Sequence, residues 1–109
     1  MSEYKGDIRN YGDDVSDLEV SPFEHLRMLY DRTELHKVQD KLNYEDKVQL
    51  AYYDVILLQN AEKMVENISK VYDFNQSTEI PLEQWWWHLD KMIKGDINFG
   101  ISSEMGKVI

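Results

Sequence analysis

The residues best suited to chemistry are three histidines, His25, His36 and His88, together with Asp54. Imidazole nitrogens and carboxylate oxygens bind metals, and facing helices can bring such side chains together. None of the histidines belongs to a Glu-x-x-His or His-x-x-x-His pair, and His25 and His36 are eleven residues apart. A metal- or small-ligand-binding helical bundle is therefore the alternative. The main expectation is a chain without cofactor, metal or catalytic residue, and hence not an enzyme.

Asp54 is expected to be a buried polar group because leucines surround it on the same helical face. A buried carboxylate must be paired or protonated. The prediction is a structural role, in which Asp54 ties its helix to neighbouring helices rather than acting as an acid or base. The candidate partners are a tryptophan indole N–H, Arg27, His25 and His36.

Residues 73–84 place oxygen-bearing side chains at alternate positions, as a calcium-binding loop does. Such a loop needs glycine at its sixth position and a bidentate glutamate at its twelfth, where this chain has Thr78 and Gln84. We therefore interpret the segment as an ordinary connection between two helices.

All three tryptophans stand together, within a stretch from Pro81 to Lys94 that has the pattern of an amphipathic helix. Successive residues of an α-helix turn by about 100°, so Trp85 and Trp86 fall on the apolar stripe and Trp87 points away from it. A terminal segment or a protein partner is expected to cover Trp87, because tryptophan is enriched at binding hot spots. The predicted partner-binding residues are Trp87, Gln84, His88 and Lys91.

Three helices are expected to position these groups. Ser21 and Pro22 suit the N-cap and first position of a helix that runs to about residue 42. Asn43 can cap a second helix, 44–72, which contains neither Gly nor Pro and is apolar on two sides. The prediction is an all-α domain at residues 21–95, a three-helix bundle whose long central helix is 44–72.

The two ends of the chain are expected to be partly ordered tails. Residues 1–20 carry six acidic against two basic residues, and Gly6 and Gly12 each cost about 1 kcal/mol in a helix. Apolar residues nevertheless recur there at helical spacing, so this acidic N-terminal arm should become ordered when it packs against something. In the C-terminal tail, 96–109, Ile97, Phe99 and Ile101 recur at every second position.

The composition of the chain limits the classes of function that are compatible with it. The net charge is −9, which disfavours direct binding to nucleic acids or anionic membranes and favours a protein partner with a basic surface. No apolar run approaches the ~18 residues of a membrane span, and no signal pattern precedes the first helix, so the expected location is the cytoplasm. The chain has no cysteine, which excludes disulfides and thiolate catalysis.

The function predicted on this basis is that of a small acidic protein-interaction module: a regulator, inhibitor or adaptor of a basic protein. Some proteins of this class imitate the charge of nucleic acid to block a nucleic-acid-binding protein. A homodimer is also expected, because the predicted helices offer more apolar surface than a domain of this size hides easily. A structural homodimer without a further partner is the remaining alternative.

Overall fold

The computed structural model describes residues 3–94, and all regular secondary structure in this range is helical. The α-helices are α1 (Lys5–Ser16), α2 (Pro22–Lys37), α3 (Tyr44–Gln59), α4 (Ala61–Ile68) and α5 (Leu89–Lys94). The short 3₁₀ helices are η1 (Gln39–Lys41), η2 (Phe74–Ser77) and η3 (Trp85–His88). The prediction of an all-α chain is confirmed for this range, and the predicted C-terminal tail lies outside the described residues.

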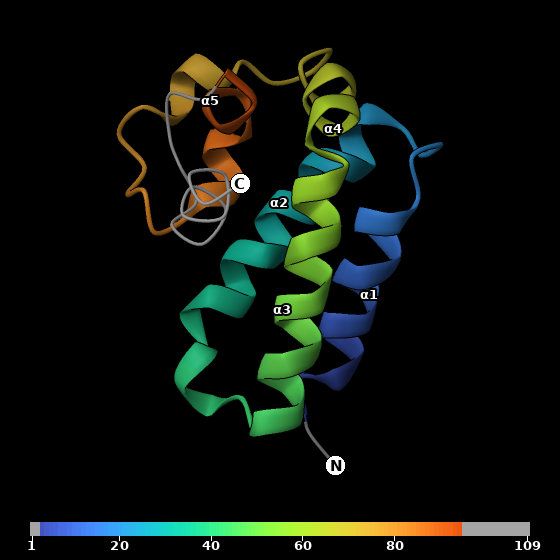
Figure 1. Cartoon of the computed structure of the whole chain (residues 1–109), viewed down its shortest axis with the longest axis vertical. Coiled ribbons are helices and arrows are strands. Elements are labelled where there is room, and N and C mark those ends of the chain that lie inside the picture. Colours follow the sequence, from blue (N-terminus) through green and yellow to red (C-terminus); the bar gives the residue numbers. More distant parts are fainter. Residues whose placement is uncertain (1–2, 95–109) are drawn as a thin grey trace, which may run out of the picture.

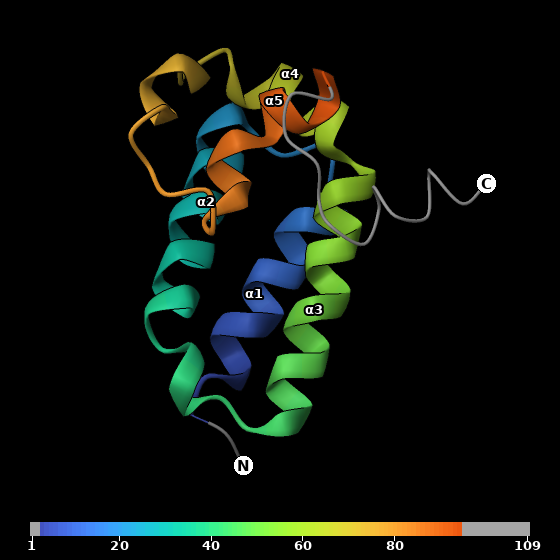
Figure 2. The ribbon, with the colours of Figure 1, turned by 60° about the vertical axis from the view of Figure 1, so that its left-hand side comes forward.

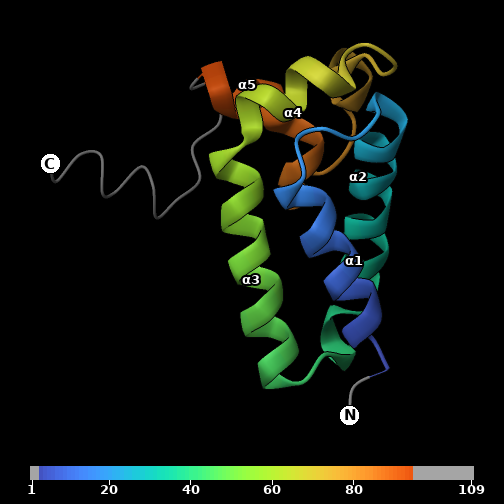
Figure 3. The ribbon, with the colours of Figure 1, turned by 90° about the vertical axis from the view of Figure 1, so that its right-hand side faces the viewer.

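The three longest helices, α1, α2 and α3, run along the long axis of the molecule in alternating directions (Figure 1). The shorter helices α4 and α5 and the segment between them lie across one end of this bundle (Figures 2 and 3). A three-helix arrangement is therefore present, but its members differ from those predicted. The helix at the N-terminus takes the place that had been assigned to the tryptophan-rich stretch.

Residues 5–16 are a core helix and not a partly ordered arm. Ile8, Tyr11 and Val15 of α1 are at most 2% exposed, and α1 packs against both α2 and α3. The apolar spacing noted in this segment is thus the seam that faces the core. Of the acidic residues within α1, Asp7 and Asp13 are exposed and Asp14 is half-buried.

The predicted long central helix is wrong, because the chain breaks at Asn60 between α3 and α4. Asn60 has φ −98° and ψ 10°, away from helical values, and its side-chain amide donates to the Val15 carbonyl at 2.9 Å. Asparagine competes for backbone hydrogen bonds in this way and so favours helix ends over helix interiors. The break lets α4 turn across the end of the bundle, and α4 itself ends at Ile68.

Two of the three predicted helix starts are confirmed, whereas the helix predicted over Pro81–Lys94 is wrong: the chain forms η3 from Trp85 and α5 from Leu89 instead. The Ser21 hydroxyl accepts a hydrogen bond from the Glu24 N–H at 3.2 Å, and Pro22 opens α2. The Asn43 side chain likewise accepts from the Asp46 N–H at 2.8 Å. The end of α2 was predicted too late: the α-helix stops at Lys37, and η1 carries the chain to the next cap.

The two glycines of α1 differ in the space around them. A Cβ atom at Gly12 would overlap the ring of Tyr53, which packs directly on the α1 backbone, whereas a Cβ atom at Gly6 would meet nothing within 4 Å. We therefore expect Gly12→Ala to lower the free energy of unfolding by about 1–3 kcal/mol through overpacking. Gly6→Ala should raise it by about 0.4–1 kcal/mol, by restricting the unfolded chain.

Urea denaturation of the two variants checks this pair of predictions. Gly6→Ala is the matched control, since both substitutions add one methyl group to the same helix. If Gly12→Ala were as stable as Gly6→Ala, the close contact between α1 and α3 would be refuted.

Within residues 3–94, no helix combines the length and the apolar character needed to cross a bilayer.

Candidate functional site

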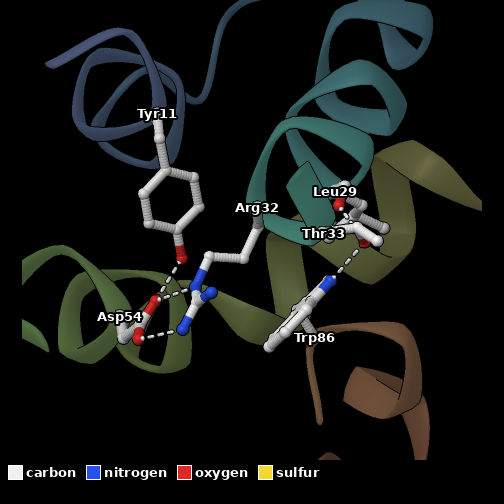
Figure 4. Close-up of polar contacts among 6 residues, drawn as sticks. All are labelled: Tyr11, Leu29, Arg32, Thr33, Asp54 and Trp86. Carbon is white, nitrogen blue, oxygen red and sulfur yellow. Dashed lines mark hydrogen bonds and ion pairs between the residues drawn. The ribbon is translucent and has the colours of Figure 1, made fainter. Parts of the chain in front are cut away.

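A largely buried ion pair joins α2 and α3, and a hydrogen bond from Tyr11 ties α1 to it (Figure 4). Arg32 of α2 donates from Nε and Nη2 to Asp54 Oδ1 and Oδ2 of α3, at 2.9 and 3.0 Å. The Tyr11 hydroxyl of α1 donates to Asp54 Oδ1 at 2.6 Å. The side chains of Arg32 and Asp54 are only 10% and 16% exposed. A two-pronged, charge-assisted contact of this kind holds one geometry well, so it fixes how α1, α2 and α3 meet.

Tyr11 remains a hydrogen-bond donor in this network. Burial raises the pKa of its hydroxyl well above the ordinary value, and the charge of Asp54 raises it further. The phenol is therefore protonated at neutral pH. Asp54 is thus satisfied by one cation and one neutral donor.

The partners suggested for Asp54 from the sequence are not the ones it has. Arg27 lies on the outer side of α2, where its Nε is 4.0 Å from Asp31 Oδ2. For one of the actual partners, Arg32, the sequence itself indicates a buried role. Arg32 lies between Leu29 and Leu35, at helical spacing, and a charged residue on an apolar stripe needs a buried partner.

Both buried indoles form hydrogen bonds with the Thr33 hydroxyl of α2. It accepts hydrogen bonds from Trp86 Nε1 at 2.9 Å and from Trp87 Nε1 at 2.8 Å, and it donates to the Leu29 carbonyl at 2.9 Å. One hydroxyl thereby uses its single donor and both acceptor positions. The Arg32 guanidinium lies 4.3 Å from the centroid of the Trp86 ring, so the ion pair and the indole cluster form one connected unit.

The prediction that Trp87 points away from the core is wrong. The three tryptophans lie in the 3₁₀ helix η3, and Trp86 and Trp87 are 0% and 4% exposed. Trp87 packs against the rings of Tyr30 and Tyr72, at centroid distances of 5.0 and 5.5 Å. An amphipathic α-helix with a single neighbour buries only one face. Instead η3 packs on α2 and also on η2 and α5, so it is covered from more than one side.

The other residues predicted to bind a partner do not form an exposed patch with Trp87. His88 is 1% exposed, and its Nε2 is 2.8 Å from the Ile80 carbonyl. Gln84 is half-buried at the start of η3. The Lys91 side chain is 27% exposed, with Nζ 3.9 Å from Asp90 Oδ2. Two of the four predicted side chains, Trp87 and His88, are therefore parts of the interior.

The histidines have separate structural partners. His25 Nδ1 accepts from the Asn67 side-chain amide at 2.8 Å, and its Nε2 lies 2.7 Å from the Asp17 carbonyl. That arrangement requires a neutral ring with its proton on Nε2. His36 lies 3.8 Å from Glu83. In the part of the chain that the structure describes, no three His, Asp or Glu side chains gather where they could hold a metal ion.

A groove with acidic walls runs between α1 and α2 and has a volume of about 390 Å³. We call it the acidic groove. Its carboxylates are Asp7 from α1 and Asp31 and Glu34 from α2, and it has no basic lining residue. The remaining lining residues are Tyr4, Asn10, Leu35 and Val38. A groove of equal volume between α1 and α3 has Lys5 and Arg9 beside Glu45 and Asp46, so its lining charges balance.

The pKa of Asp31 reflects its surroundings in the acidic groove. Burial raises the pKa of Asp31; Arg27 opposes this, and the charges of Asp7 and Glu34 add to it. A carboxyl group whose pKa rises on folding stabilises the fold when protonated, and that contribution disappears as the pH rises through the raised pKa. At neutral pH the charge of Asp31 therefore works against the fold, and its ion pair with Arg27 offsets part of that cost. Glu34 is paired with Lys37, whose Nζ lies 2.9 Å from Glu34 Oε2.

Comparison of the chain with the models of known protein families, with curated proteins and with solved structures finds no match.

Proposed function

We propose that this protein is a non-enzymatic interaction module that binds a basic segment of a protein partner in its acidic groove. The observation that carries the proposal is the set of three carboxylates, Asp7, Asp31 and Glu34, around a groove without a basic lining residue. The surface used differs from the tryptophan cluster suggested by the sequence, because Trp87 and His88 are buried.

The shape and charge of the groove suit a lysine or arginine side chain. Its lining includes the buried Leu35 and the half-buried Val38, against which the aliphatic part of such a side chain can pack. Asp7 can then pair with the cationic end, and Asp31 and Glu34 can do so by exchanging their exposed partners Arg27 and Lys37. With a net charge of −9, the whole chain also attracts a basic partner from a distance and speeds its association. Nucleic-acid-binding proteins are one class with such a basic surface, and blocking them by charge mimicry is one form that regulation could take.

Affinity capture with matched variants tests this function. The groove variant carries Asp7→Asn, Asp31→Asn and Glu34→Gln. The control variant carries Glu62→Gln, Glu66→Gln and Glu79→Gln, which are exposed positions on α4 and the following segment. Both triple variants change the net charge by the same amount. We expect the wild type and the control to retain a basic protein that elutes as salt rises, and the groove variant to lose it.

Folding of the groove variant is checked by thermal denaturation at neutral pH. Its stability should be close to that of the wild type, since the substitutions remove crowded carboxylates together with two exposed ion pairs, each of which contributes little. Equal loss of the partner by both triple variants would show that only net charge matters and would reject the groove. Salt-independent capture would reject the electrostatic basis altogether.

A further inference from the structure

The outer side of α3 is apolar and exposed, although the chain as a whole is rich in charge. Tyr44, Val48, Tyr52 and Val55 are 81%, 50%, 61% and 51% exposed. We call these residues, together with the exposed Ala51 and Gln59, the α3 face. The helix lies along an edge of the bundle (Figures 2 and 3).

The α3 face is also free of charge. From Val48 to Gln59 the sequence contains one charged residue, Asp54, and its carboxylate is turned inward to Arg32. Charged residues make up 30% of the chain, so a helix face of this length without any is unusual for a surface that meets only water. A basic partner would have to bury unpaired charge there, which is costly.

The spacing of the face is that of a helix-pairing seam. Tyr44, Val48, Ala51 and Val55 recur at intervals of four, three and four residues, which is the a/d repeat of paired helices. Nothing in the core accounts for this repeat, because these side chains are exposed and the core side of α3 is formed by Leu50 and Leu57. A repeat of this kind on an exposed face predicts that a second helix with an uncharged, apolar stripe packs there.

We infer that the α3 face binds the same face of a second copy of this chain, with the two α3 helices antiparallel. A second copy presents an uncharged, apolar stripe of the same length, and a two-fold axis makes one patch complementary to itself. The proposal goes beyond the acidic groove and does not depend on it.

Charge decides the relative direction of the helices. The exposed charges of α3, Glu45 and Lys47, lie in its first turn, and its last turn has none. A parallel pair would place each Glu45 beside the other and align the two helix dipoles. An antiparallel pair moves the two charged turns to opposite ends of the seam, which leaves only apolar and amide side chains between the helices.

The contact is modest in size. With about 150–250 Å² for a fully buried tyrosine, the exposed parts of the α3 face amount to roughly 400 Å² per copy. That lies below the ~800 Å² per partner of a standard stable interface, so we expect a dimer that dissociates on dilution.

Sedimentation of the full chain over a wide concentration range tests the inference. The apparent mass should rise from the 13.0 kDa monomer towards twice that value. Val55→Glu, which places a carboxylate within the face, should raise the concentration at half-dimerisation by at least tenfold. Phe23→Glu is the matched control, because Phe23 is an apolar residue on α2 with 68% exposure, and it should leave self-association unchanged.

A cross-linking measurement provides an independent readout, since the chain has no cysteine of its own. Ala51→Cys lies at the midpoint of the stripe, where an antiparallel pair brings the two copies of residue 51 together, so oxidation should give a disulfide dimer. Phe23→Cys should not cross-link under the same conditions. The inference is overturned if the full chain stays monomeric at millimolar concentration, or if Val55→Glu and Phe23→Glu behave alike. It is equally overturned if only a chain ending at Lys94 self-associates, since residues 95–109 would then occupy the face.

Discussion

Replacing Asp54 by alanine is expected to lower the free energy of unfolding by about 3 kcal/mol or more, because Arg32 would be left buried without its carboxylate. For a domain of this size the midpoint of thermal unfolding should fall by roughly 12 °C or more. Tyr11 would also lose its acceptor, so α1 would be held less firmly than before. Thermal and urea denaturation, followed by circular dichroism, measure both effects.

The double variant Arg32→Met with Asp54→Leu is the control for this experiment. It removes both charges together, so it should recover much of the stability that Asp54→Ala loses. Tyr11→Phe removes one hydrogen bond and leaves the ion pair intact, and it should cost less than Asp54→Ala. An Asp54→Ala protein as stable as the wild type would show that the carboxylate is solvated and that the ion pair does not join the helices.

Trp87→Ala should destabilise the protein by about 3–5 kcal/mol, since the indole is 4% exposed and its loss leaves a cavity beside Tyr30 and Tyr72. The Thr33 hydroxyl would also lose one of its two donors. Urea denaturation gives the magnitude. The result separates the two interpretations of Trp87, because an exposed binding residue could be removed without unfolding the domain.

The neighbouring tryptophan serves as the control. Trp85 is half-buried and adjacent in sequence, so Trp85→Ala should cost less than Trp87→Ala. If Trp87→Ala unfolded at the same urea concentration as the wild type while a bound partner was lost, Trp87 would belong to an interface. The burial described for η3 would then be contradicted.

Helix starts could be predicted from the sequence because they depend on residues next to one another. The Ser21 and Asn43 caps act over three residues, and both were found where the pattern places them. Helix ends depend more on tertiary contacts. Asn60 ends α3 while its side chain bonds to Val15, a residue of another helix, and no local pattern in α3 reveals that bond.

The N-terminal segment shows how packing overrides propensity. Gly6 and Gly12 lower the intrinsic preference for helix, which favoured a loose arm. In the structure Gly12 is required by the approach of Tyr53, and Tyr11 gains the buried contact with Asp54. The gain from these contacts exceeds the propensity cost, and neither contact is visible without knowing that α1 lies beside α3.

The candidate site was only partly accessible from the sequence. Asp54 was singled out correctly as a residue that needs a partner, but the choice among the cations of α2 required knowing which side of that helix faces inward. The acidic groove arises between α1 and α2, so it became visible only once residues 5–16 were recognised as a helix. The apolar repeat of α3 could be identified from the sequence, whereas its exposure to solvent could not.

Binding in the acidic groove is measured by the change in the chemical shifts of the backbone amides as an oligoarginine peptide is added to dilute protein. We predict that the changes concentrate around Asp7 on α1 and over residues 31–38, and that they vanish in the groove variant but persist in the control variant. Shifts centred on residues 84–91, or spread evenly over all acidic surfaces, would contradict binding in the acidic groove.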